Sequence, residues 1–67
     1  MSVAKVTEIT AGSPKGFDDA VRQGLARASK TLKNIHGAWI SEQKVVVSKS
    51  SIEEWRVTMK VSFVLEE

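Results

Sequence analysis

The 67-residue chain has no cysteine and no tyrosine, one proline, one histidine and no long run of apolar residues. Without cysteine it forms no disulfide and no thiolate metal site, and its one histidine has no second histidine or cysteine with which to build a nucleophile–base pair. No segment is apolar enough to cross a bilayer, and the N-terminal residues lack a signal-peptide pattern. We therefore expect a cytoplasmic protein that is not an enzyme, has no metal site of its own and has no membrane partner.

The charge of the chain is nearly balanced, with ten Lys and Arg against eight Asp and Glu and a net charge of +2. This excess is too small for a nucleic-acid-binding arm, so we expect no nucleic-acid partner. The length predicts a single domain, residues 1–67, which buries only about 60% of the surface that its unfolded chain exposes. Small domains without disulfides commonly gain stability by oligomerising, so the length alone favours a homo-oligomer.

Turn residues divide the chain into one helix and three strands. Residues 3–10 are rich in β-branched types and predict a strand that ends at Ala11-Gly12-Ser13-Pro14. A helix is predicted over residues 14–34, with Ser13 as its N-cap and His36-Gly37 as its exit. The apolar residues of this helix form one stripe, which consists of Phe17, Val21, Leu25, Ala28, Leu32 and Ile35. Gly24 lies beside the stripe and predicts a close approach to a sheet.

Two further strands are predicted over residues 38–47 and 55–65, joined by a polar turn at residues 48–51. The last strand alternates strictly, with apolar residues at its odd positions, so we expect its odd face to cover the helix. A right-handed crossover makes the first two strands parallel, and the third lies between them, antiparallel to both. The predicted fold class is α+β, with the order β-α-β-β, a three-stranded antiparallel sheet and one helix packed on one face.

Nothing in the chain covers the other face of this sheet. We expect Ala38 and Ile40 to face the helix. The uncovered face then receives the intervening residues of the second strand, namely Trp39, Ser41, Gln43, Val45 and Val47. The even positions of the third strand share this face, namely Arg56, Thr58, Lys60 and Ser62. An exposed tryptophan beside valines marks either an interface with another subunit or a platform for a planar ligand.

The chain resembles the dodecins, a family of small flavin-binding proteins of β-α-β-β fold, over nearly its whole length. The resemblance is carried by the N-terminal strand with its Gly-Ser-Pro exit and by three further segments. These are GLARASKTLKNI (residues 24–35), AWISEQ (residues 38–43) and WRVTMKVSFVLEE (residues 55–67). The resemblance implies a hollow homododecamer that binds pairs of flavins, FMN or riboflavin, between subunits at threefold-related interfaces. It implies storage or buffering of flavin, and for some members coenzyme A as a further ligand.

The resemblance also implies which residues meet the flavin. In the family a tryptophan of the second strand stacks on the ring and a glutamine of the third strand bonds its polar edge. In this sequence Gly37 stands at the tryptophan position and Arg56 at the glutamine position, while Trp39 follows two residues later on the same face. We expect Trp39 to stack and Arg56 to be the polar contact. Glu42 and Lys44 either meet the ribityl chain or phosphate of the flavin or form a solvated strand edge.

The remaining candidate residues favour structural roles. His36 follows the predicted helix end, where a cation is useful, and the pairs Asp18-Asp19 and Glu53-Glu54 suit a helix start and a solvated turn. A loop with the ligand spacing of a calcium site is absent. The alternative to flavin binding is a dodecin-like shell that has lost flavin and holds ions such as calcium between subunits, or is purely structural.

Overall fold

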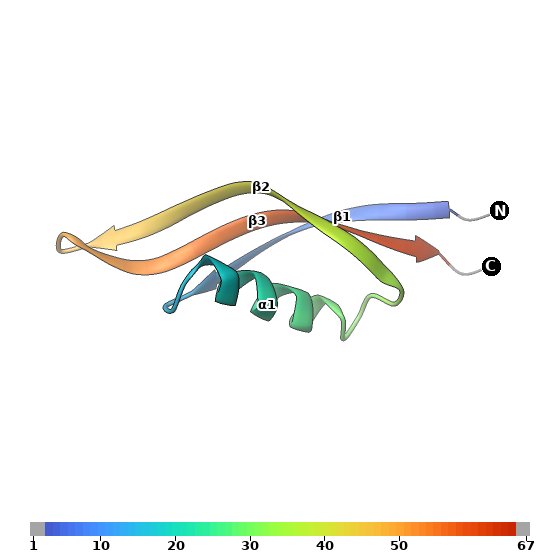
Figure 1. The fold of residues 1–67 in the computed structure, drawn as a ribbon, viewed down its shortest axis with the longest axis horizontal. Coiled ribbons are helices and arrows are strands. Elements are labelled where there is room, and N and C mark those ends of the chain that lie inside the picture. The colour runs from blue at the N-terminus through green and yellow to red at the C-terminus, as the bar shows by residue number, and fades with distance from the viewer. Residues whose placement is uncertain (1–2, 66–67) are drawn as a thin grey trace.

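The computed structural model describes residues 3–65, which form one helix and three strands (Figure 1). Strand β1 spans Val3–Ser13, helix α1 Phe17–Ala28, strand β2 Ile35–Ser48 and strand β3 Ser51–Leu65. β3 lies between β1 and β2 and is antiparallel to both. The predicted class, the order β-α-β-β and the central place of the third strand are confirmed.

The helix begins later than the predicted residues 14–34, because Ser13 does not act as its N-cap. Ser13 is buried at the end of β1, where its hydroxyl donates a hydrogen bond to the carboxylate of Asp19. The same hydroxyl accepts a bond from the backbone N–H of Lys15, 2.9 Å away. Gly16 takes the N-cap position without a side-chain bond. Ser13 therefore ties the end of β1 to the helix rather than starting the helix.

The helix also ends earlier than predicted, at Ala28. The next residue, Ser29, turns its hydroxyl back onto the carbonyl oxygen of Leu25, 2.8 Å away. Hydroxyl groups that bond to nearby backbone compete with continued helix. Asn34 then adopts a φ of 62°, a left-handed conformation that asparagine tolerates, and β2 begins at Ile35. The predicted exit at His36-Gly37 was therefore wrong, because those residues already belong to the strand.

All three strands are longer than predicted. β1 continues through Gly12, which pairs with Arg56 of β3. The predicted polar turn between β2 and β3 is confirmed and is very tight, since only Lys49 and Ser50 lie between the strands, with φ of 52° and 65°. Two successive left-handed residues suit the twist of a hairpin, so the strands run up to Ser48 and Ser51 on either side.

The core lies between the helix and the middle of β3. Val57, Met59 and Val61 of β3 are buried and pack with Ala20 of the helix, which confirms the predicted odd face at these positions. Further along the same face Phe63 is only half-buried and Leu65 is exposed, because they lie where the helix has ended.

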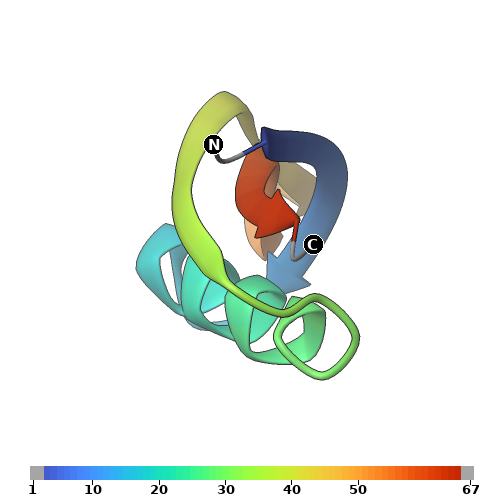
Figure 2. The same cartoon turned by 90° about the vertical axis from the view of Figure 1, so that its right-hand side faces the viewer.

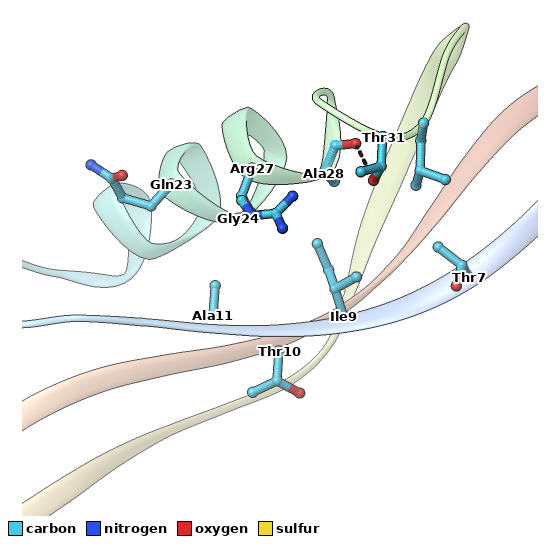
Figure 3. Close-up of a pocket in the computed structure, with 10 residues that line it drawn as sticks. Thr7, Ile9, Thr10, Ala11, Gln23, Gly24, Arg27, Ala28 and Thr31 are labelled. Atoms are coloured by element: carbon cyan, nitrogen blue, oxygen red, sulfur yellow. Dashed lines mark hydrogen bonds between the residues drawn. The ribbon is translucent and has the colours of Figure 1, made fainter.

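Gly24 brings the helix close to the sheet, as predicted. A Cβ atom at this position would lie 2.6 Å from Cε of Met59 and 3.0 Å from Cβ of Ala11. Figure 3 shows Ile9 and Ala11 directed from β1 towards the helix, whereas Thr10 points to the other side of the sheet. Beside this contact a groove of about 500 Å³ runs between α1 and β1.

The molecule is elongated, with extents of 52 × 19 × 13 Å. The helix packs on β1 and β3, and the β2–β3 hairpin continues beyond it, as Figure 1 shows. Viewed from the end, the strands curve over the helix (Figure 2). Ala38 and Ile40 pair with Val61 and Met59 on the helix side of the sheet, as expected, yet both side chains are exposed. Within residues 3–65 the helix is too short to cross a membrane.

Candidate functional site

A β-bulge at Ser41 decides which residues of β2 share the face opposite the helix, here called the outer face. Ile40 pairs with Met59 and Glu42 with Thr58, so Ser41 is an extra residue without a partner of its own. Its hydroxyl donates to the carbonyl oxygen of Thr58 at 3.1 Å. Beyond an extra residue the alternation of a strand is shifted by one.

This shift corrects part of the predicted outer face. Gln43 pairs with Val57 and Val45 with Trp55, so both lie on the helix side, and Val47 follows Val45 by normal alternation. Gln43, Val45 and Val47 were therefore wrongly assigned to the outer face. The sequence pattern gives no signal for the bulge, since a serine within a strand is compatible with regular pairing.

The outer face is a ladder of four rows across the three strands, because residues directly opposite each other share a face. In the order β1, β3, β2 the rows are Gly12–Arg56–Lys44, Thr10–Thr58–Glu42, Glu8–Lys60–Trp39 and Val6–Ser62–Gly37. All five residues predicted to meet a ligand, Trp39, Arg56, Gly37, Glu42 and Lys44, lie on this face.

One half of the outer face is aromatic and open. Trp39 is 50% exposed, and the next row contains only Gly37, Ser62 and the exposed Val6. A Cβ atom at Gly37 would lie 3.4 Å from Oγ of Ser62, so the position has room for a side chain. The tryptophan ring therefore borders a low, uncharged area of the sheet on one side.

The other half of the outer face is charged. Glu42, Lys44 and Arg56 line a cleft of about 210 Å³ together with two threonines, Thr10 and Thr58. The threonine hydroxyl oxygens lie 3.2 Å apart. Charged groups and hydroxyls in one cleft suit a polar ligand that both donates and accepts hydrogen bonds.

Within one chain Trp39 and Arg56 lie two rows apart on the outer face. Trp39 lies across from Lys60 and Lys44 across from Arg56, so the tryptophan and Arg56 are four residues apart along β3, about 13 Å. The guanidinium of Arg56 bonds to Glu54, which lies still further from Trp39 along the strand.

Of the other candidate residues from the sequence, His36 and Asp18 lie apart from this face. Glu54 lies on it beside Arg56, and the pair Glu53-Glu54 belongs to β3 rather than to the predicted solvated turn. His36 is the extra residue of a second bulge, between Ile35 and Gly37, and is exposed rather than located at the helix end. Asp18 bonds to Arg22 within the helix, and this hydrogen bond lowers the pKa of the Asp18 carboxyl. Among residues 3–65 no three His, Cys, Asp or Glu side chains gather as metal ligands do.

Comparison with known proteins agrees with this architecture. The family model for dodecins matches residues 3–66. The dodecin of Thermus thermophilus is 32% identical over 65 residues, which cover 97% of this chain and 94% of the relative. The calcium dodecin of Mycobacterium tuberculosis is 32% identical and covers 94% of this chain and 89% of its own.

Solved structures of dodecins are also similar to this chain over almost its whole length. Dodecin from Streptomyces davaonensis superposes with a TM-score of 0.95 at 41% identity, and the match covers 98% of this chain and 97% of the other. The calcium dodecin of Mycobacterium tuberculosis, described as having a novel calcium-binding site, gives a TM-score of 0.85 at 29% identity, over 97% of this chain and 93% of its own.

A single helix on a three-stranded antiparallel sheet is the architecture that this chain shares with the solved dodecin structures. The family match over nearly every residue makes the assignment specific. The chain belongs to the dodecin family, whose members are small, non-enzymatic flavin-binding proteins.

Proposed function

We propose that this protein binds and sequesters a flavin, FMN or riboflavin, on the outer face of its sheet as a closed dodecamer. The observation that carries the proposal is the half-exposed Trp39 beside the open area over Gly37 and Ser62. A planar heteroaromatic ring stacks well on an exposed indole, and the low surface beside Trp39 leaves room for it. A storage or buffering role in the cytoplasm is part of this proposal.

The displaced tryptophan is compatible with this role. Gly37 stands where the family carries its stacking tryptophan, and Trp39 lies on the same face one row away, about 7 Å along the strand. The polar contacts come from the charged cleft, where Arg56, Lys44 and Glu42 offer donors and an acceptor to the ring edge, the ribityl chain or a phosphate. Because Trp39 and Arg56 are far apart in one chain, the assembly supplies the second half of each site.

Quenching of flavin fluorescence during titration tests the proposal. Stacking on an aromatic side chain is worth about 1–3 kcal/mol, so Trp39→Ala should weaken riboflavin binding by at least about fivefold. Trp39→Phe should retain part of the affinity. Trp55→Phe, on the helix side of the sheet, is the matched control and should leave the affinity unchanged. A wild-type protein that leaves flavin fluorescence unquenched at saturating concentration contradicts flavin binding.

Light scattering tests the assembly. The outer face and the hairpin beyond the helix expose large apolar side chains, including Trp39, Val47 and Ile52, which a second copy would cover. We expect a mass near twelve chains at micromolar concentration. A monomer under these conditions contradicts the closed assembly and the shared flavin sites.

A second candidate is calcium binding, favoured by the similarity to the calcium dodecin of Mycobacterium tuberculosis. The outer face has carboxylates in Glu42 and Glu8, one on each edge strand, so copies of the chain would have to combine them around an ion. Isothermal titration with calcium chloride distinguishes the two. Heat of binding that is lost in Glu42→Gln, together with no flavin quenching, favours the calcium shell.

A further inference from the structure

The guanidinium of Arg56 is held by a carboxylate of its own strand. Nε and one terminal nitrogen of Arg56 both donate to Oε1 of Glu54, at 2.9 and 2.5 Å. The two residues are two apart on β3, and both side chains are partly shielded from solvent, 42% exposed for Arg56 and 32% for Glu54. Two charge-assisted bonds to one oxygen fix the plane of the guanidinium better than a single contact does.

Gly12 provides the place for this carboxylate. A Cβ atom at Gly12 would lie 2.6 Å from both Cδ and Oε2 of Glu54, so the carboxylate rests where any other residue has its side chain. Gly12 does not have a left-handed φ, so the backbone at this position accepts other residues. What glycine supplies here is room for Glu54.

The contact also separates two like charges. Lys44 stands directly across from Arg56 on β2, and like charges at opposed positions of a sheet repel. Gly12 stands across from Arg56 on the other side, on β1. A carboxylate seated over Gly12 therefore draws the guanidinium towards β1 and away from Lys44.

We propose that Glu54, seated on Gly12, is a positioning residue that fixes Arg56 before any ligand arrives. The inference rests on the proposed flavin site, in which Arg56 is the polar contact. A free arginine would have to be immobilised by the ligand, whereas the clamped one presents its remaining N–H donors in one orientation. The cost of ordering one long side chain corresponds to about a two- to tenfold difference in affinity.

Two variants remove the contact between Glu54 and Arg56, here called the clamp, in different ways. Glu54→Gln removes the carboxylate charge, and Gly12→Ala keeps every charge but displaces the carboxylate, which is the flexible end of its side chain. Glu53→Gln is the matched control, since it removes the neighbouring, exposed carboxylate and changes the net charge equally. Each variant should melt within a few degrees of the wild type, because none alters the buried core.

The first measurement needs no ligand. The chain has three arginines, so arginine-labelled protein gives three Nε–H signals by NMR, with the exposed Arg27 as internal reference. Exchange of the Arg56 Nε–H with water should be severalfold slower than that of Arg27 in the wild type and in Glu53→Gln. It should rise to the Arg27 rate in Glu54→Gln and Gly12→Ala. Equal rates for Arg56 in the wild type and in Glu54→Gln overturn the positioning role.

The second measurement is a riboflavin titration of the same four proteins. Glu54→Gln and Gly12→Ala should weaken binding by about two- to tenfold, and Glu53→Gln should match the wild type. Unchanged affinity in both clamp variants overturns the claim that the clamp serves the ligand. A wild type that binds no riboflavin refutes the proposed function instead, while the exchange rates still decide whether Glu54 positions Arg56.

Discussion

The contact between Gly24 and Met59 makes a sharp test of how the helix packs. Met59 is completely buried, and its terminal methyl occupies the space directly over Gly24. Met59→Ala removes this methyl and leaves a cavity that the helix cannot fill, because Gly24 has no side chain. Truncation of a buried methionine to alanine costs about 2–5 kcal/mol, and we expect the upper half of this range.

Gly24→Ala is destabilising for the opposite reason. The added methyl lies too close to Met59 and to Ala11, and overpacking costs about 1–3 kcal/mol, partly offset by the roughly 1 kcal/mol higher helix propensity of alanine. In the double variant the new methyl occupies part of the space that Met59 vacated. We therefore expect the double variant to be more stable than the sum of the two costs predicts, by at least about 1 kcal/mol.

Urea denaturation at a fixed protomer concentration measures this cycle, since the stability of an oligomer depends on concentration. Ala26→Gly, at an exposed helix position, isolates the propensity difference between glycine and alanine. If the free-energy change of the double variant equals the sum of the two single changes within about 0.5 kcal/mol, the contact between Met59 and Gly24 is refuted.

Three further changes test local features. Ser13→Ala removes the hydrogen bonds to Asp19 and to the backbone N–H of Lys15, and it should lower the free energy of unfolding in urea by about 1–3 kcal/mol. An unchanged free energy of unfolding would mean that Ser13 does not stabilise the junction between β1 and the helix. Ser50→Gly relieves a left-handed serine in the hairpin turn and should raise stability by up to about 1 kcal/mol; a lower melting temperature would contradict this. The hydrogen bond from Arg22 lowers the pKa of Asp18 below its ordinary 3.8, so its small stabilising effect is complete above that pH and is lost as the pH falls through the lowered pKa. Melting curves of wild type and Asp18→Asn should therefore converge in acid, and a gap that widens there would contradict the pairing.

Most of the fold follows from periodicity and turn chemistry. The strict alternation of the last strand predicts both its central place and the buried residues Val57, Met59 and Val61, because a strand with one packed face must alternate. The predicted helix is too long at both ends. At its C-terminal end the apolar stripe continues through Leu32 and Ile35, although the helix itself ends at Ala28, where the Ser29 hydroxyl bonds to the backbone. The spacing of apolar residues predicts which side chains pack on the core. It does not predict whether those residues belong to the helix or to the loop that follows it.

The candidate site was predictable only in part. Trp39 and Arg56 were placed on one face by alternation, and pairing with β3 supports this. The placement of Glu42 and Lys44 beside Arg56 depends on the bulge at Ser41, whose cause is a pairing between distant strands rather than a local pattern. The contact of Glu54 with Gly12 joins β3 to β1, and no spacing along the chain encodes it.

The thinness of the molecule has a kinetic consequence. A body 13 Å deep and 52 Å long has few side chains that are wholly enclosed, and its hairpin extends past the helix with Val47 and Ile52 in contact with water. In the proposed dodecamer, an isolated copy would therefore reach its final shape with only part of the apolar contacts that stabilise it, and the rest would form on collision with another copy. Refolding should then include a second-order phase whose rate rises with protomer concentration, so that dilution slows the last step of folding itself.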